Sequence, residues 1–482
     1  MQCLSKHTKT FSRILFLVWA AALILTVNIF RFLWLDQSPP GFHVDELAGG
    51  VTLQCLAENG VDALDNTYPL FADLNYGSPK PPTYIYPGMM WGKIFGYSIS
   101  SLRSLTVVFA LLTILGLFFL CRLMFDVRMA LWVALVSTLS PWGFQISRIA
   151  LESFLAPCLM IWGMVLFLKS HSVFKAIVAG IFFSLAMYSY PSARIHLPLL
   201  FFPILFLKHR WNGLKRREFL ALMTACAVTT LPLALGIIQG QYMSRFQTIG
   251  IFSDQYLQSI GKTKIFPDLF EVFTNNYLQH LQPNFLFFQG DKNYVYGTGY
   301  IGICGWVEAL ALWLGLFYVI YLLIQFLLKK KTISRFEGAF IIVMWFGILS
   351  GIVPSALTWS DIPHSLRMLG SWPFLMGWLG YVYWKLTQRF EYTALMVCLL
   401  ATVFMGPYLR DYFTQYPNRS YYMFYSYAED MAKSCRSEED WKKFIYIFRN
   451  ENFHLRYYLM NYHEGQNCAS TQRLWKQVEP LP

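Results

Sequence analysis

The sequence predicts an all-α membrane protein that crosses the bilayer many times. Of its 482 residues, 56% are hydrophobic and only 14% are charged, which excludes a soluble globular protein. Its apolar runs are continuous and about 17 to 25 residues long, the length of a helix that crosses the hydrocarbon core. A membrane barrel would show short alternating segments instead. The expected fold class is therefore polytopic and helical.

The formal net charge of +12 is explained by membrane topology. Lys and Arg concentrate in short loops between the apolar runs, as in proteins that keep basic loops in the cytoplasm. We therefore expect no nucleic-acid partner. The first apolar run, residues 14–35, follows Lys6, Lys9 and Arg13 and is too long for a cleavable signal. It predicts an uncleaved signal anchor with a cytoplasmic N-terminus.

Eleven crossings place the basic loops on the inner side. They cover residues 14–35, 102–124, 129–146, 150–168, 174–190, 195–207, 219–238, the run that leads to Lys329, and residues 340–353, 369–384 and 392–408. Residues 82–99 are also apolar, but a crossing there would put every later basic loop outside. They predict an interfacial helix on the outer surface.

The crossings define a membrane domain, residues 1–408, and a smaller outer domain, residues 409–482. The membrane domain contains two outer loops, residues 36–100 and residues 239–300. The small domain is expected to be α/β and extracytoplasmic. It would have helices at 420–435 and 453–462 and a strand at 442–448, where the sequence contains Phe-Ile-Tyr-Ile-Phe. Its cysteines, Cys435 and Cys468, either pair in a disulfide or remain free thiols.

Ionisable residues collect at the predicted outer ends of the crossings. Such residues are costly at membrane depth and usually line a cavity or a pathway. They are the cations Lys80, Arg103, Arg148, Arg194 and Arg367, the histidines His196 and His364, and the acids Asp45, Glu46 and Glu152. Cations beside carboxylates suit the binding of an anionic group next to a nucleophile that must lose a proton.

Several motifs follow one another in a specific order along the chain. They are Asp45-Glu46, Pro79-Lys80-Pro81-Pro82, Ser147-Arg148-Ile149-Ala150-Leu151-Glu152, Pro191-Ser192-Ala193-Arg194 and Pro363-His364-Ser365-Leu366-Arg367. In these motifs and their order the chain resembles membrane glycosyltransferases of the GT-C fold. The group it resembles is the bacterial branch of the protein O-mannosyltransferases and aminoarabinose transferases, which are family 39-like glycosyltransferases.

The resemblance implies an inverting glycosyltransferase in the bacterial plasma membrane. Its donor would be a polyprenyl-phosphate sugar, and its acceptor a hydroxyl group of a protein, lipid A or another glycoconjugate outside the cell. The lipid bilayer would be a further partner. Two alternatives stay open: a flippase or transporter of a lipid-linked sugar, which would need a polar path across the membrane, and a polysaccharide ligase or polymerase.

On the family's pattern, Asp45 is expected to be the catalytic base and Glu46 either a second catalytic acid or an idle neighbour. The alternative for Asp45 is a helix cap, since an acid near a helix N-terminus is stabilised by the helix dipole. Lys80 matches the lysine expected to contact the lipid phosphate, and its alternative is a solvated loop residue. Arg148 and Glu152 lie four residues apart, so they either contact substrate or pair with each other.

Arg194 and Arg367 are expected to bind phosphate, because a guanidinium group matches its oxygen atoms. Arg103 either shares this role or extends to the lipid headgroups. His364, like His196, either binds the sugar or satisfies a helix end. Asp291 is expected to be a structural residue or a turn residue.

No metal-ligand set is evident beyond three of the acids, Asp45, Glu46 and Glu152. We therefore expect no cofactor, although this pattern alone leaves a divalent metal open.

Overall fold

The computed structural model describes residues 2–62, 65–72, 79–169, 171–240, 242, 244–328, 333–389, 393–448, 452–463 and 466–477. In this part of the chain the ordered elements are helices, and extended pairing is limited to isolated bridges. The all-α prediction is confirmed. Lys329, the basic residue at the end of the eighth predicted crossing, lies outside the described residues.

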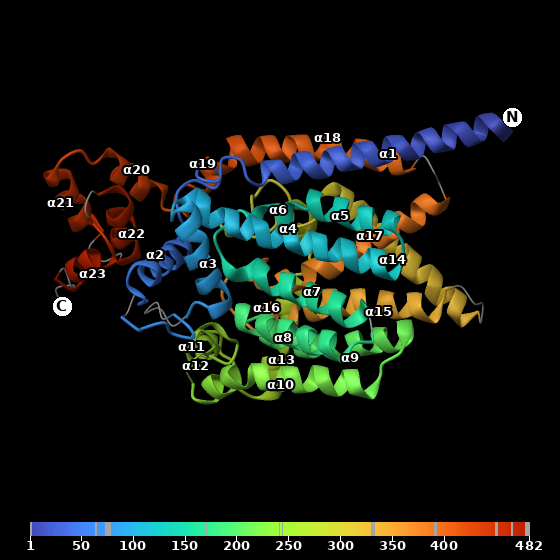
Figure 1. Ribbon diagram of the computed structural model, residues 1–482, viewed down its shortest axis with the longest axis horizontal. Helices are drawn as coiled ribbons and strands as arrows, with labels where there is room; N and C mark the ends of the chain where they lie inside the picture. Colours follow the sequence, from blue (N-terminus) through green and yellow to red (C-terminus); the bar gives the residue numbers. More distant parts are fainter. Residues whose placement is uncertain are drawn as a thin grey trace.

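The long helices lie side by side along the longest axis of the molecule (Figure 1). They follow the predicted crossings in order: α1 (Gln2–Phe30), α4 (Ile99–Met124), α5 (Val127–Leu139) with α6 (Pro141–Ser147), α7 (Leu155–Lys169), α8 (Val173–Ser189), α9 (Ala193–Asn212), α10 (Arg216–Ile238), α14 (Trp306–Leu327), α15 (Arg335–Ser350), α17 (Trp372–Arg389) and α18 (Thr393–Thr414).

Length and hydropathy single out a subset of these helices as membrane spans. Among the described residues 6 helices qualify, or up to 7 if α5 and α6, which meet at 62°, form one broken span. Residues Ile14–Phe30 of α1 and the helix α8 are shorter apolar helices. The remaining predicted crossings coincide with helices of the same bundle.

Close helix packing depends on small residues inside the bundle. Gly180 of α8 faces α10, where an added Cβ would lie 2.8 Å from the carbonyl oxygen of Leu222. The Sγ of Cys226 donates to the carbonyl of Gly180 at 3.5 Å. Without side chains between them, the two backbones approach closely, as is common in membrane helix pairs.

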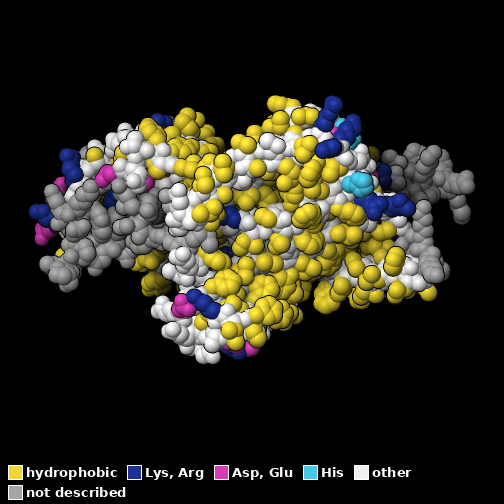
Figure 2. Space-filling view, turned by 90° about the horizontal axis from the view of Figure 1, so that it is seen from below, with side chains coloured by type: hydrophobic (Ala, Val, Ile, Leu, Met, Phe, Trp, Pro, Cys, Tyr) yellow, Lys and Arg dark blue, Asp and Glu magenta, His cyan; other side chains and the backbone are white. Residues whose placement is uncertain are grey.

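The outside of the bundle is apolar, as contact with lipid requires. Figure 2 shows hydrophobic side chains over most of one face, with most of the charged side chains toward its two ends. Along α10, for example, Val228, Leu231 and Ile238 are 66%, 55% and 80% exposed. Apolar exposure on this scale is typical of a membrane-facing surface.

Shorter helices complete the fold. At one end of the bundle lie α2 (Val44–Asn59), α3 (Pro82–Phe95), α11 (Ser244–Ile249) and α12 (Asp254–Ser259) (Figure 1). The loops between long helices also contain η1 (Glu152–Phe154), α13 (Phe266–Gln279), η2 (Asn284–Phe288), α16 (Val353–Ala356) and η3 (Leu369–Ser371). The helix predicted at 82–99 is present as α3.

The C-terminal segment is helical, so the predicted α/β domain is wrong. Its helices are α19 (Tyr416–Ser420), α20 (Ser426–Ser434), α21 (Glu438–Ile447), α22 (Asn452–Tyr462) and α23 (Cys468–Gln477). The predicted strand at 442–448 lies mostly within α21. A capping box between Ser437 and Asp440 starts this helix. Trp441, Phe444 and Phe448 are buried at helical spacing, which the short aromatic run concealed.

The C-terminal segment is tied to α2 by a disulfide. Cys468 pairs with Cys55, with their Cα atoms 5.2 Å apart, and Cys435 is a free thiol. Neither of the two expected states, a Cys435–Cys468 disulfide or two free thiols, is therefore present. The partner of Cys468 is 413 residues away in the chain and lies in a different segment, so no local pattern in the sequence links the two cysteines. Arg456 donates to both sulfur atoms, at 3.2 Å and 3.4 Å.

We predict that Cys468→Ser lowers the free energy of unfolding by about 2 to 4 kcal/mol, as expected for loss of a native disulfide. Thermal unfolding of the purified protein in detergent measures this change. The matched control is Cys435→Ser, which should leave the unfolding temperature nearly unchanged. Peptide mapping without reduction checks the linkage itself, and a Cys435–Cys468 peptide would contradict the prediction.

Candidate active site

The segment between α1 and α2 is held in place by a buried arginine, Arg148. Its guanidinium group donates hydrogen bonds of 2.7 to 3.2 Å to the carbonyls of Phe30, Arg31, Leu33, Trp34 and Ser38. The same group packs 5.0 to 5.6 Å from the ring centroids of Phe144, Tyr412 and Phe413. Arg148 therefore shapes the chain that leads into α2.

A buried ion pair then fixes the start of α2. Nε and Nη2 of Arg103 each lie 2.9 Å from a different oxygen of Glu46, and both side chains are fully buried. Glu46 also accepts the backbone N–H groups of Ala150 at 2.6 Å and His43 at 3.0 Å. Arg103 donates further to the carbonyls of Leu35, Pro39 and Gly41. The pair joins α2 and α4 to the segment before η1.

These contacts reassign three of the predicted site residues. Glu46, Arg103 and Arg148 are not among the residues that line the cavity described below. Their side chains contact protein backbone and, for Glu46 and Arg103, each other. Arg103 does not extend to the headgroups, because Glu46 holds it. Arg148 and Glu152 do not pair, although their spacing allowed it, since a non-helical turn between α6 and η1 separates them.

Six of the remaining predicted site residues line one cavity of about 400 Å³. They are Asp45, Lys80, Glu152, Arg194, His364 and Arg367. They come from α2, the segment before α3, η1, α9 and the loop before α17, which are far apart in the sequence. The structure thus gathers two carboxylates, three permanent or near-permanent cations and an imidazole around one space.

Lys80 and Glu152 form an ion pair in the cavity wall. Nζ of Lys80 lies 3.1 Å from Oε2 of Glu152, and both side chains are largely buried. Two backbone hydrogen bonds with Ala72, of 3.1 Å and 2.8 Å, fix the position of Lys80. Lys80 is thus a buried residue with a defined place rather than a solvated loop lysine.

Asp45 lies in the first turn of α2, and its side chain is 33% exposed. The capping box of this helix is made by His43 and Glu46, which leaves the Asp45 carboxylate outside that role. Nδ1 of His43 lies 3.8 Å from Oδ2 of Asp45. The helix dipole still favours the ionised carboxylate at this position. Asp45 therefore presents a carboxyl group at the cavity, and its role as a base remains a prediction.

The two cavity arginines are fixed by neighbouring oxygen atoms. Arg194 donates to the carbonyls of Met187 at 3.2 Å and Tyr242 at 3.4 Å. Arg367 donates to Thr358 and Ser360 over 2.6 to 2.9 Å. Both guanidinium groups are thereby held at the cavity that also contains Lys80.

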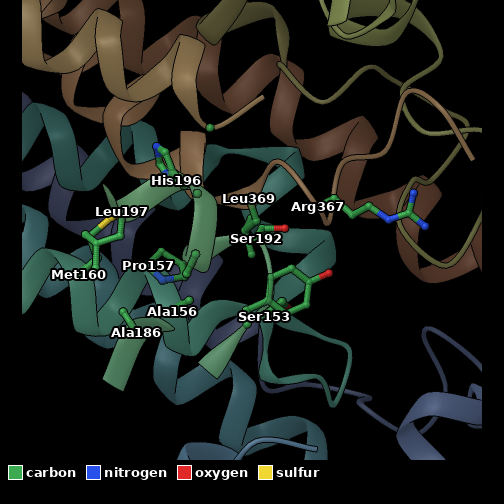
Figure 3. A pocket seen from close by; sticks show the side chains of 14 residues that line it. Ser153, Ala156, Pro157, Met160, Ala186, Ser192, His196, Leu197, Arg367 and Leu369 are labelled. Carbon is green, nitrogen blue, oxygen red and sulfur yellow. The ribbon is translucent and has the colours of Figure 1, made fainter. Parts of the chain in front are cut away.

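A narrow apolar pocket adjoins the cavity and shares Tyr190, Ser192 and Arg367 with it. Figure 3 shows its apolar lining and the guanidinium group of Arg367 pointing away from that lining. His196 is buried there, with Nε2 3.1 Å from the carbonyl of Gly347. Of its two predicted roles, the structure supports the contact with a helix.

Several cavity residues were not predicted, chiefly Tyr190, Tyr242 and Tyr296. Tyrosines are so frequent in this chain that their position alone gave no signal. Asp291 was expected in a turn, and its Oδ1 does accept the backbone N–H of Asn293 at 3.0 Å.

Within the described residues, no group of three or more His, Cys, Asp or Glu side chains is placed to hold a metal ion. The expectation of no cofactor remains a prediction.

Comparisons with known proteins agree with this architecture. The sequence model of the dolichyl-phosphate-mannose-protein mannosyltransferase family matches residues 79–235, about a third of the chain. The match includes Lys80, Glu152 and Arg194 of the cavity. No curated protein matches the chain in sequence.

Solved membrane glycosyltransferases have a similar fold. ArnT from Cupriavidus metallidurans bound to undecaprenyl phosphate superposes with a TM-score of 0.53 at 14% identity, over 95% of this chain and 88% of that one. The Archaeoglobus fulgidus oligosaccharyltransferase gives 0.50 with a tethered acceptor peptide and 0.51 with Zn and sulfate, at 15% and 16% identity. These two matches cover 88% and 89% of this chain but only 58% and 56% of the archaeal chain. At such identities the likeness establishes the fold alone.

We predict that Arg103→Met lowers the free energy of unfolding by about 3 to 5 kcal/mol, because it leaves the Glu46 carboxylate buried without its charge partner. Thermal unfolding in detergent measures the change. The control is Arg122→Met, an exposed arginine at the other end of the same helix. Equal unfolding temperatures for the two variants would show that the buried pair does not hold the start of α2.

Proposed function

We propose that this chain, an all-α polytopic protein with the GT-C fold, transfers one sugar from a polyprenyl-phosphate carrier to an acceptor hydroxyl. The observation that carries the proposal is the single cavity that unites Asp45 with Lys80, Arg194 and Arg367. A carboxylate can remove the acceptor proton, and the cations can stabilise a phosphate leaving group.

Binding of the carrier phosphate is assigned to the cavity cations. Arg194 and Arg367 carry permanent charges on planar groups that match phosphate oxygen atoms. Lys80 adds a third charge, oriented by Glu152. The apolar outer surfaces of the long helices suit the hydrocarbon part of such a carrier. ArnT, which has a similar fold, was solved with undecaprenyl phosphate bound.

The transfer itself is a displacement at the anomeric carbon. Asp45 accepts the proton of the acceptor hydroxyl, whose oxygen forms the new bond to the anomeric carbon. The bond between that carbon and the phosphate oxygen breaks, and its electron pair leaves with the lipid phosphate. Attack opposite the leaving group inverts the anomeric configuration. Positioning a base in this way contributes roughly 10² to 10⁴ in rate.

We place this cavity on the outer side of the bacterial plasma membrane, with the N-terminus in the cytoplasm. The Cys55–Cys468 disulfide supports this orientation, because disulfides persist in oxidising compartments and are rare in the cytosol. Cys55 belongs to α2, the helix that begins at Asp45 and its neighbours, so the disulfide and the cavity share one end of the bundle. The acceptor is then a protein, lipid A or another glycoconjugate of the cell envelope.

We predict that Asp45→Asn lowers sugar transfer by about 10² to 10⁴, the contribution of a general base, and leaves binding of undecaprenyl phosphate intact. Transfer is measured by mass spectrometry of envelope glycoconjugates, and binding with purified protein. Asp36→Asn, an exposed acid before α2, is the matched control and should transfer normally. Undiminished transfer by Asp45→Asn would remove Asp45 as the base, and carrier movement without transfer by the unmodified protein would favour a flippase.

We further predict that transfer persists after divalent ions are removed with EDTA, because the proposed charge stabilisation comes from Lys80, Arg194 and Arg367. The measurement compares the transfer rate before and after chelation, with magnesium added back. A loss of activity that added magnesium restores would show that a metal contributes to the reaction.

A further inference from the structure

A buried network behind the cavity fixes the position of His364. This residue lines the cavity although it is only 4% exposed. Its backbone N–H donates to Nε2 of His280 at 3.1 Å. The next residue, Ser365, donates its backbone N–H at 2.8 Å and its hydroxyl at 3.0 Å to Oδ2 of Asp291. The turn that presents His364 is therefore anchored at two consecutive residues.

The hydrogen bonds of His280 define its tautomer. Its Nδ1 lies 2.8 Å from the carbonyl of Asn276, which only accepts, so Nδ1 carries the proton. Its Nε2 accepts from the backbone N–H of His364 at 3.1 Å, and the hydroxyl oxygen of Ser355 lies 2.7 Å from the same nitrogen. This arrangement needs a neutral ring, and burial does lower the pKa of His280 to about 4. His280 is a neutral support in this network.

The imidazole of His364 lies beside the carboxylate of Asp291. Its Nδ1 is 3.7 Å from Oδ2 of Asp291, which is itself 2% exposed. One face of the ring packs on Tyr296, with 4.6 Å between ring centroids. Because Nδ1 faces the carboxylate, Nε2 is on the opposite side of the ring. Burial raises the pKa of Asp291 to about 6, opposed by its bonds to Ser365 and Asn293.

We propose that His364 donates its Nε2–H to the leaving phosphate of the lipid carrier and that Asp291 is the positioning residue that orients the ring. This inference rests on the proposed function. The proton count closes: Asp45 gains the acceptor proton, the phosphate oxygen gains the proton of His364, and the breaking bond leaves its electron pair on that oxygen. Return of one proton from Asp45 through solvent restores both groups.

Other charges around this pair set when the ring is protonated. Asp361 and Arg367 belong to the same loop, His280 comes from the end of α13, and Lys80, Arg194, Glu152 and Asp45 share the cavity. The three cations oppose a positive ring, whereas the four carboxylates favour it. A bound phosphate adds negative charge beside the ring and so favours its protonated form. We therefore expect His364 to be protonated when the carrier is present.

The test is the binding of undecaprenyl phosphate to the purified full-length protein across about pH 5 to 8, where histidine titrates. For the unmodified protein the affinity should be highest at low pH and fall as His364 loses its proton. In His364→Gln it should be about tenfold lower at low pH, the contribution of one charge-assisted hydrogen bond, with little difference at high pH. The phosphate's own titration affects both proteins alike and cancels in this comparison. The control is His209→Gln. His209 is an exposed histidine near the end of α9, away from the cavity residue Arg194 at the start of that helix.

The positioning role is tested with Asp291→Asn, which keeps the size and an acceptor for Ser365. Removing the negative charge should shift the pH at which affinity falls to a lower value. In the His364→Gln background the same change should have no further effect. His364→Asn is measured in parallel. A variant is included in the comparison only if it unfolds at the same temperature as the unmodified protein.

Two results overturn the inference. One is an unchanged affinity and pH dependence in His364→Gln. The other is an Asp291→Asn effect that is equal at every pH or persists without His364, which would mark Asp291 as structural only. Failure of the proposed function looks different: the unmodified protein would not bind undecaprenyl phosphate at any pH, and the role of His364 would fall with it.

Discussion

The ion pair between Glu46 and Arg103 is the interaction on which the candidate active site depends. Both side chains are fully buried, and both also form hydrogen bonds with protein backbone. Removing two charges from water is costly, and only good geometry with added hydrogen bonds compensates for it. Here the added bonds join α2, α4 and the residues before η1, so the pair determines where Asp45 meets the cavity.

The charges at this end of the molecule are divided between two tasks. Arg103 and Arg148 donate to backbone carbonyls of one irregular segment, residues 30–41, which would otherwise be buried with unsatisfied oxygen atoms. Lys80, Arg194 and Arg367 are anchored by fewer contacts at the cavity wall. The two buried arginines thus hold the backbone in place, whereas Lys80, Arg194 and Arg367 face the cavity.

The C-terminal helices also hold α2 and the loop before it in place. The disulfide joins α23 to α2, and the backbone N–H of Phe42 donates to the carbonyl of Phe424 at 2.8 Å. Gly41 has a φ of 61° and lies so close to Phe424 that a Cβ there would be 2.5 Å from its carbonyl oxygen. A glycine is needed at this position for both reasons. The C-terminal segment therefore supports the loop before Asp45 in addition to forming a domain at the surface.

The sequence by itself determined the helical class, the order of the long helices and the set of residues among which the site was found. The lengths of the apolar runs and the positions of the charged residues can be read locally from the sequence. Ionisable side chains are costly at membrane depth, so their presence there marks candidate site residues. Only the tertiary structure decided which of them meet. Glu46 and Asp45 are neighbours in the chain, yet one is buried against Arg103 and the other faces the cavity. Cys55 and Cys468, like His364 and Asp291, are partners through folding alone, because a pairing between distant segments leaves no local pattern in the sequence.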